Sequence, residues 1–219
     1  MDLTLFVTYG PQLLKGVMFT LYVCGGALVI GLLLGMLLCI IGRSGNRALY
    51  VFYRLYITLF RGTPLLVQIY LVFYGGPFVG LEFSEIQVGI GGLGLYTAAY
   101  FAEIFRSGFQ SIPKGQIEAA TDLGFSRSQT FFHVSLPQMF AGVLPTLVNQ
   151  TILLVKESAI LSVITVPEMT TAATRMSTET FSVIEPYLFL GFTYWLITFT
   201  LSRAARRVET RLTAYIAAR

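Results

Sequence analysis

Residues 115–138 read GQIEAATDLGFSRSQTFFHVSLPQ, a polar stretch that separates two long apolar runs of the chain. Within sixteen residues it carries four polar ionisable side chains, namely Glu118, Asp122, Arg127 and His133. The sequence on either side consists mostly of residue types that are usually buried away from water. The contrast indicates a membrane protein in which this stretch meets a soluble partner.

The same stretch favours two short helices joined by a turn. Gln116–Leu123 contain no helix breaker, and Pro113 suits a first helical position, where a missing N–H costs nothing. Gly124 suits the left-handed conformation that ends many helices. Ser126 and Gln129 then match the S-x-x-Q capping box, which predicts the start of a second helix.

Composition extends the membrane assignment to the whole chain. Of its 219 residues, 55% are hydrophobic and 12% are charged, whereas a soluble domain carries about a quarter charged residues. We therefore expect one all-α, polytopic membrane domain over residues 1–219. Cys24 and Cys39 both lie in one apolar run and are interpreted as small buried hydrophobic residues.

The apolar runs predict five membrane spans, the second of them interrupted near its start. A run without charge that is long enough to cross the bilayer as a helix defines the first span. The expected spans are Gly16–Gly42, Leu55–Phe78, Ile86–Phe105, Met139–Val166 and Pro186–Leu201.

The basic residues predict the orientation. Eleven of the fifteen Lys and Arg residues fall in three segments, which alternating spans place on one side of the membrane. By the positive-inside rule that side is cytoplasmic, so the N-terminus is expected outside and the C-terminus inside. The three clusters are Arg43, Arg47 and Arg54; Arg106, Lys114 and Arg127; and Arg203, Arg206, Arg207, Arg211 and Arg219.

Several polar and charged residues lie inside the predicted spans. Arg61-Gly62-Thr63-Pro64 can break the second span, and irregular backbone at membrane depth is tolerated only beside a cavity or inside protein. Alternatively, Arg61 marks the membrane border and Pro64 begins a helix. In the fourth span the adjacent Lys156 and Glu157 point about 100° apart on a helix, so they cannot simply neutralise each other and indicate a cavity or an interface.

The third span has one polar and aromatic face, because four side chains recur at helical spacing. An ionisable group such as Glu103 costs several kcal/mol in a span unless it is paired or hydrated. Pairing with Arg106, one turn later at the cytoplasmic border, is one way to meet that cost. The four side chains are Tyr96, Tyr100, Glu103 and Ser107.

The central polar stretch resembles the EAA motif of membrane subunits of bacterial ABC importers. The resemblance implies that segment 111–138 holds a cytoplasmic coupling helix, which rests in a groove of a separate ATPase subunit. The alternative is an ordinary amphipathic cytoplasmic loop. The residues that carry the motif are Gly115, Glu118, Ala119, Ala120 and Gly124, with Leu-Pro-Gln at 136–138.

Three further segments are similar to permeases for polar amino acids, of the histidine, glutamine, arginine and opine type. They are RGTPLLVQ at 61–68, AYFAEIFRSG at 99–108 and LPTLVNQTILLVKESAILSVI at 144–164, and the likeness extends over roughly residues 12–212. It implies the type I ABC importer permease fold, with five transmembrane helices.

The same likeness implies a weak substrate site near the middle of the membrane. Thr63 and Ser158 would offer hydroxyls to the α-carboxylate of an amino acid, and Glu103 would take its ammonium group. Glu157 would also line the site, although this family usually has Asp there. Two carboxylates mildly favour a cationic amino acid, but the α-ammonium present in every amino acid is an alternative use of Glu103.

The resemblance also implies partners in the bacterial cytoplasmic (inner) membrane. These are a dimer of ATPase subunits that bind ATP and Mg, a second permease subunit, identical or related, and a periplasmic or lipid-anchored binding protein. The chain itself has no Walker A pattern and no G-x-G-x-x-G after a strand. His133 has no metal-ligand partner at a suitable spacing, so no metal, cofactor, catalytic residue or nucleic acid is expected. The alternatives from other classes are an ion-coupled transporter or channel, and an intramembrane enzyme.

Overall fold

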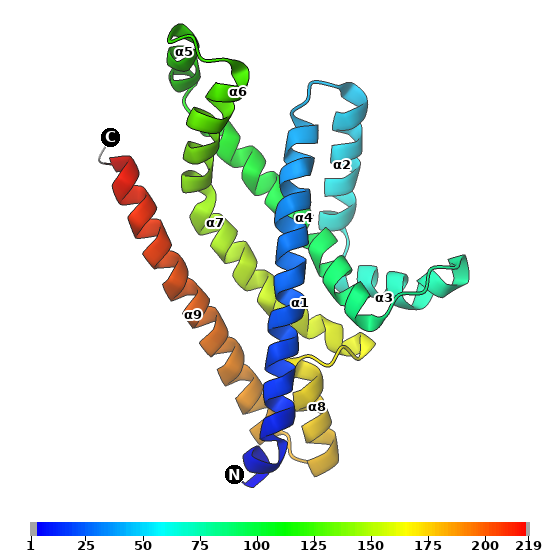
Figure 1. Ribbon diagram of the computed structural model, residues 1–219. Coiled ribbons are helices and arrows are strands. Elements are labelled where there is room, and N and C mark those ends of the chain that lie inside the picture. Colours follow the sequence, from blue (N-terminus) through cyan, green and yellow to red (C-terminus); the bar gives the residue numbers. More distant parts are fainter. Residues whose placement is uncertain (1–3, 218–219) are drawn as a thin grey trace.

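The computed structural model describes residues 4–217, and over that range every regular element is helical (Figure 1). The all-α expectation is therefore confirmed. In chain order the elements are α1 (Thr4–Gly42), α2 (Arg47–Gly62), α3 (Leu65–Gly75), η1 (Gly76–Val79), α4 (Glu85–Gln110), α5 (Lys114–Asp122), α6 (Arg127–Gln129), η2 (Thr130–Ser135), α7 (Leu136–Glu157), η3 (Ser158–Ile164), α8 (Met169–Thr180) and α9 (Ile184–Ala217).

The described helices contain the expected spans. Four stretches are long and apolar enough to cross a membrane. The helices α2 and α3, bent by 99° at their junction, together make a fifth span, which is broken. The expected number is confirmed when this pair is counted as one. The four continuous stretches are Val7–Gly42, Glu85–Gln110, Arg127–Ile164 and Ile184–Val208.

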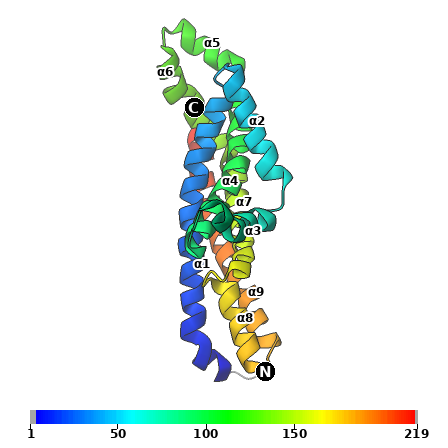
Figure 2. The same cartoon turned by 90° about the vertical axis from the view of Figure 1, so that its right-hand side faces the viewer.

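The molecule is elongated, with different elements at its two ends. Figures 1 and 2 show α5, α6 and the turn between α1 and α2 at one end, towards which the last part of α9 also runs. The start of α1 and the helix α8 lie at the opposite end. The helix α3 projects sideways between these ends (Figure 1). We call the end that holds α5 the coupling end.

The helices α1 and α2 both begin earlier in the chain than the sequence predicted. The helix α1 starts at Thr4 rather than Gly16, and Leu13 in this extra part is buried. The hydroxyl of Tyr9 donates to Glu179 Oε2 at 3.0 Å, which ties the start of α1 to α8. These contacts to the rest of the chain explain why the helix extends through residues that hydropathy alone left outside it.

The first turn at the coupling end is also shorter than expected. The first two predicted spans left residues 43–54 as the connection between them, but α2 already begins at Arg47. The side chain of Asn46 accepts from the backbone N–H of Ala48 at 2.9 Å and of Leu49 at 3.4 Å, and so caps the helix. The basic cluster at 43–54 therefore lies mostly on a helix. Arg219, which belongs to the third basic cluster, lies outside the described residues.

The helix α4 is the centre of the structure, since it contacts α1, α2, α3 and α7. Its crossing with α1 is close because Gly31 and Gly35 of α1 face Phe101. A Cβ atom on Gly35 would lie 2.7 Å from the Cβ of Phe101 and 3.1 Å from the backbone nitrogen of Ala102. Phe101 is fully buried, so there is little space into which it can move.

We predict that Gly35→Ala destabilises the protein. Removing a helical glycine should stabilise by up to about 1 kcal/mol, but overpacking at this crossing should cost about 1–3 kcal/mol and dominate. Thermal unfolding of the detergent-solubilised chain tests this. The matched control is Gly25→Ala on the same helix, where a Cβ meets nothing within 4 Å. Equal melting temperatures for the two variants would show that the crossing is not tight.

Candidate functional site

The break between α2 and α3 lies at Thr63 and Pro64, both in extended backbone conformation. A break leaves carbonyl groups without helical partners, and such groups need donors inside a membrane. The side-chain amide of Gln68 donates to the carbonyls of Phe60 (3.0 Å) and Thr63 (3.1 Å) and to Thr63 Oγ1 (2.8 Å). The hydroxyl of Thr63 in turn donates to the Leu59 carbonyl at 2.8 Å. The predicted break is therefore present, and a side chain supplies donors to its free carbonyl groups.

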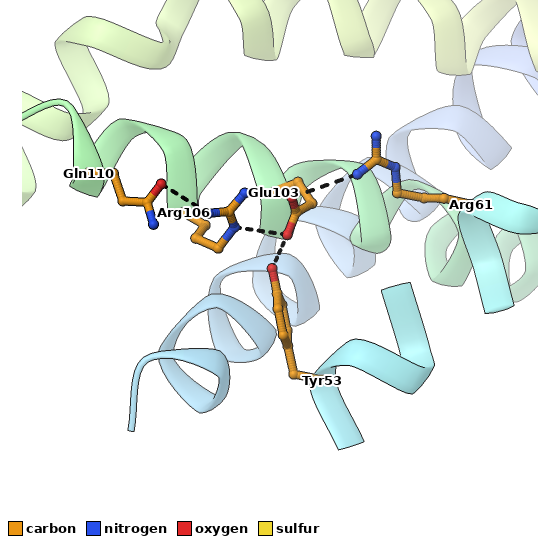
Figure 3. A network of polar contacts seen from close by, with 5 residues as sticks. All are labelled: Tyr53, Arg61, Glu103, Arg106 and Gln110. Carbon is orange, nitrogen blue, oxygen red and sulfur yellow. Dashed lines mark hydrogen bonds and ion pairs between the residues drawn. The ribbon is translucent and has the colours of Figure 1, made fainter. Parts of the chain in front are cut away.

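The carboxylate of Glu103 on α4 is held by groups from two helices (Figure 3). Arg106 donates from Nε to Oε1 at 3.0 Å and from Nη2 to Oε2 at 2.8 Å. The hydroxyl of Tyr53 on α2 also donates to Oε1, and Arg106 Nη1 donates to Gln110 Oε1 at 2.9 Å. Pairing with Arg106, which the sequence offered as one alternative, is thus present. Each carboxylate oxygen of Glu103 already accepts a hydrogen bond.

A second arginine, Arg61, stands next to this group at the end of α2 (Figure 3). Its Nη1 lies 3.8 Å from Glu103 Oε2, which is an ion-pair distance but too long for a hydrogen bond. Its Cζ lies 5.1 Å from the centroid of the Tyr100 ring, and 41% of its side chain is exposed. Two guanidinium groups thus accompany one carboxylate, which leaves one positive charge uncompensated within this group.

Tyr96 and Tyr100 extend the polar groups along α4. Their hydroxyls lie 3.0 Å apart, and Tyr96 lies close enough to the Glu157 carboxylate on α7 to interact with it electrostatically. The atom Oε2 of Glu157 is buried and has no hydrogen-bond partner among the residues that the structure describes. We call the row from Glu157 through Tyr96, Tyr100 and Arg61 to Glu103 the polar strip.

The four predicted substrate residues do not all lie together. Glu103 and Glu157 stand at the two ends of the polar strip, and Thr63 lies two residues beyond Arg61 at the helix break. Ser158 is fully buried, and its hydroxyl donates to the Val155 carbonyl at 2.8 Å. It lies beside Cys24 and Tyr194, hence towards α1 and α9. Its neighbour Glu157 points elsewhere because consecutive helical residues diverge by about 100°.

Two residues of the site have roles that the sequence did not predict. Arg61 was identified only as part of the break, and Tyr53 was not identified at all. Tyr53 reaches Glu103 across fifty positions of sequence, and no local pattern encodes such a contact. The charge of Arg61 next to a break was the available signal for its place in the site.

The helix α5 and the turn after it follow the local sequence signals. Gly124 has φ of 82°, the left-handed conformation that its position after the helix requires. In the capping box Ser126 Oγ accepts from Gln129 N–H at 3.3 Å, and Gln129 Oε1 accepts from Ser126 N–H at 2.9 Å. One detail differs, since Pro113 precedes the helix as its N-cap, in extended conformation, rather than occupying the first helical position.

Most of the predicted coupling residues are on the surface. Gly115, Glu118, Ala119 and Gly124 are exposed, while Ala120 is buried against the chain itself. Between α5 and η2 lies a hollow of about 390 Å³. Its lining is largely apolar or uncharged and consists of Ile117, Thr121, Phe125, Arg127, Thr130, Phe131 and Ser135. An exposed helix beside a partly apolar hollow, at the end of the molecule, is suited to contact a protein partner.

Residues 27–214 match the family described as "Binding-protein-dependent transport system inner membrane component". The chain is 33% identical over 210 residues to the putative glutamine transport system permease protein GlnP of Rickettsia felis, covering 94% of this chain and 96% of the relative. It is 33% identical over 213 residues to the arginine transport system permease protein ArtQ of Bacillus subtilis, covering 97% of each.

Solved structures share the fold. A chain in the crystal structure of an amino acid ABC transporter with histidines has a TM-score of 0.90 and 34% identity, covering 96% of this chain and 99% of that chain. A chain of the inward-facing MetNI methionine ABC transporter has a TM-score of 0.74 at 19% identity, covering 97% and 99%. The second likeness shows the fold alone, and both agree with the type I permease fold expected from the sequence.

The geometry around Glu103 predicts different structural roles for the two arginines. Arg106→Gln should destabilise the protein by about 1–3 kcal/mol, because it removes two charged hydrogen bonds. Arg61→Gln should cost less than about 1 kcal/mol, as for a partly exposed ion pair without a hydrogen bond. Thermal unfolding of the two variants in detergent measures the difference. An equal loss in both would contradict the unequal contacts seen here.

The family match covers most of the chain, and the relatives and the first solved structure cover nearly all of it. The five-span helical fold agrees with both. This chain therefore belongs to the family of binding-protein-dependent transport system inner membrane components, the membrane-spanning permeases of ABC transporters.

Proposed function

We propose that this chain forms the translocation path of an ATP-driven importer for a polar amino acid and couples that path to a separate ATPase subunit. The observation that carries the proposal is the direct connection between α4 and α5. The polar strip follows α4, and only residues 111–113 separate the end of α4 from the exposed helix α5. A movement of α5 on a partner would therefore act on the helix that bears the strip.

The distribution of charge supports a cytoplasmic position for the coupling end. The turn between α1 and α2, the start of α5 and the later part of α9 all lie towards this end (Figure 1), and they carry the basic clusters. The positive-inside rule then places α5 in the cytoplasm, where an ATPase subunit dimer with bound ATP and Mg can reach it. The opposite end, with α8, faces the binding protein that delivers substrate. We place the chain in the bacterial cytoplasmic membrane.

Exposed polar groups support a second permease subunit. Lys156 and Asn149 of α7 are exposed in this single chain, although both lie in a membrane-spanning stretch. A charged side chain in a span needs water or a partner. A second copy or a related chain would enclose these groups together with the polar strip and complete the path.

The relatives named for glutamine and arginine transport support an amino acid as the substrate. Within this proposal Glu157 and Thr63 contact the substrate, while Glu103 positions the two arginines. The atom Oε2 of Glu157 has no hydrogen-bond partner within the described part of the chain, which favours a substrate with a positive group besides its α-ammonium. Ser158 directly follows Glu157 in the chain, but its side chain is buried.

We expect Glu118→Arg to abolish coupling. Reversing the charge on the exposed face of α5 should reduce co-purification of the ATPase subunit, and ATP-dependent uptake, by about tenfold or more. Gly124→Arg should act in the same direction, since it also places a side chain at a left-handed position. The control for ATPase recovery is Thr178→Arg, which adds the same group to exposed α8 at the opposite end. Normal ATPase recovery and uptake with Glu118→Arg would refute the coupling role.

The cationic preference has a separate test. Glu157→Gln should lower uptake of L-arginine by about tenfold, because it removes the charged partner of the side chain. Uptake of L-glutamine, if the wild type transports it, should change much less. Competition uptake assays in proteoliposomes measure both. An equal fall for both amino acids would show that Glu157 does not discriminate side-chain charge.

A further inference from the structure

The polar strip needs a donor for the α-carboxylate of an amino acid, and the hydroxyls expected for that task are already in use. Thr63 Oγ1 donates its proton to the Leu59 carbonyl, and Ser158 Oγ donates to the Val155 carbonyl. A hydroxyl has one proton to donate. Neither group is therefore free to donate to a substrate carboxylate in this conformation.

Glu103 is equally unavailable for an ammonium group. Both of its oxygens accept from Arg106, one of them also from Tyr53, and its charge is balanced by Arg106. The positive charge left over in the group belongs to Arg61. Within the part of the chain that the structure describes, Arg61 makes a 3.8 Å ion pair and a ring contact but no hydrogen bond.

We propose that Arg61 binds the α-carboxylate of the transported amino acid. A guanidinium group offers five N–H donors in a planar fork that matches a carboxylate. Tyr100 supports the fork from one side through a cation–π contact, and 41% of the side chain is open to a ligand. This inference rests on the proposed function, and it replaces Thr63 and Ser158 as the carboxylate ligands.

The position of Arg61 suits this task. It lies in the last turn of α2, where the helix dipole favours a cation. The helix break that follows is fixed by Gln68, so the backbone that carries Arg61 is held in place. A carboxylate on Arg61 would bridge α2 to the strip on α4 and make the substrate part of the contact between these helices.

The opposite end of the strip supplies the complementary charge. Tyr100, beneath Arg61, and Tyr96, beside Glu157, are four residues apart, which is about 6 Å along α4. With its carboxylate at Arg61, an amino acid would extend along the strip and bring a positive side-chain group towards Glu157.

Pairs of amino acids and their decarboxylated amines test the proposal directly. The sample is the purified complex of this permease with its co-purifying ATPase subunit, without binding protein. The probes are L-arginine against agmatine and L-histidine against histamine, measured by equilibrium binding. For the wild type we expect the amino acid to bind about 10- to 100-fold more tightly than its amine.

Arg61→Gln should remove this preference by weakening amino acid binding to the level of the amine, while amine binding stays unchanged. Arg61→Lys, which keeps the charge but loses the fork, should give an intermediate value. Arg54→Gln, at an exposed position on the same helix, removes the same charge and should bind as the wild type. The small loss of stability expected for Arg61→Gln separates a binding role from a structural one.

Two results would overturn the inference. If the wild type prefers amino acids and Arg61→Gln keeps that preference, Arg61 is not the carboxylate ligand, and the proposed function stands. If the wild type binds neither amino acids nor amines, and neither stimulates ATP hydrolysis, both the inference and the proposed amino acid substrate are wrong.

Discussion

The carboxylate of Glu103 is the interaction on which the arrangement of the polar strip depends. It joins Arg106 of its own helix to Tyr53 of α2, and so fixes the broken second span against α4. Because α4 also contacts α1, α3 and α7, this one group links the break to the centre of the structure. The same pairing satisfies Glu103 and leaves the neighbouring Arg61 with an uncompensated charge.

The membrane imposes the second constraint. Backbone groups and charges in a span need internal partners or water, and this chain meets that requirement unevenly. Gln68 donates to the carbonyls left free at the break between Thr63 and Pro64. Among the residues that the structure describes, one oxygen of Glu157 has no hydrogen-bond partner and Arg61 makes no hydrogen bond. Arg61 on α2 and Glu157 on α7 meet the tyrosines of α4, and in the proposed function a polar ligand binds along this strip.

Features encoded by neighbouring residues were predictable from the sequence. The spans follow from the length of apolar runs, the helix break from Arg61-Gly62-Thr63-Pro64, and the turn after α5 from Gly124 and the capping box. The starts of α1 and α2 were not, because they depend on a contact to α8 and on the cap by Asn46. The partners of Glu103 and the burial of Ser158 could not be predicted because they depend on tertiary contacts. The contacting residues lie far apart in sequence or on diverging helix faces.

In the proposed function, nucleotide-driven movement at α5 reaches the polar strip through α4, and an amino acid moves through this chain at the expense of ATP. The most direct measurement is uptake of labelled L-arginine, L-glutamine or L-histidine into proteoliposomes that hold the permease, its ATPase subunit and its binding protein. We expect accumulation of the amino acid that requires enclosed ATP and is insensitive to loss of the proton gradient. Uptake that continues without ATP and stops when the gradient is dissipated would contradict the proposed function.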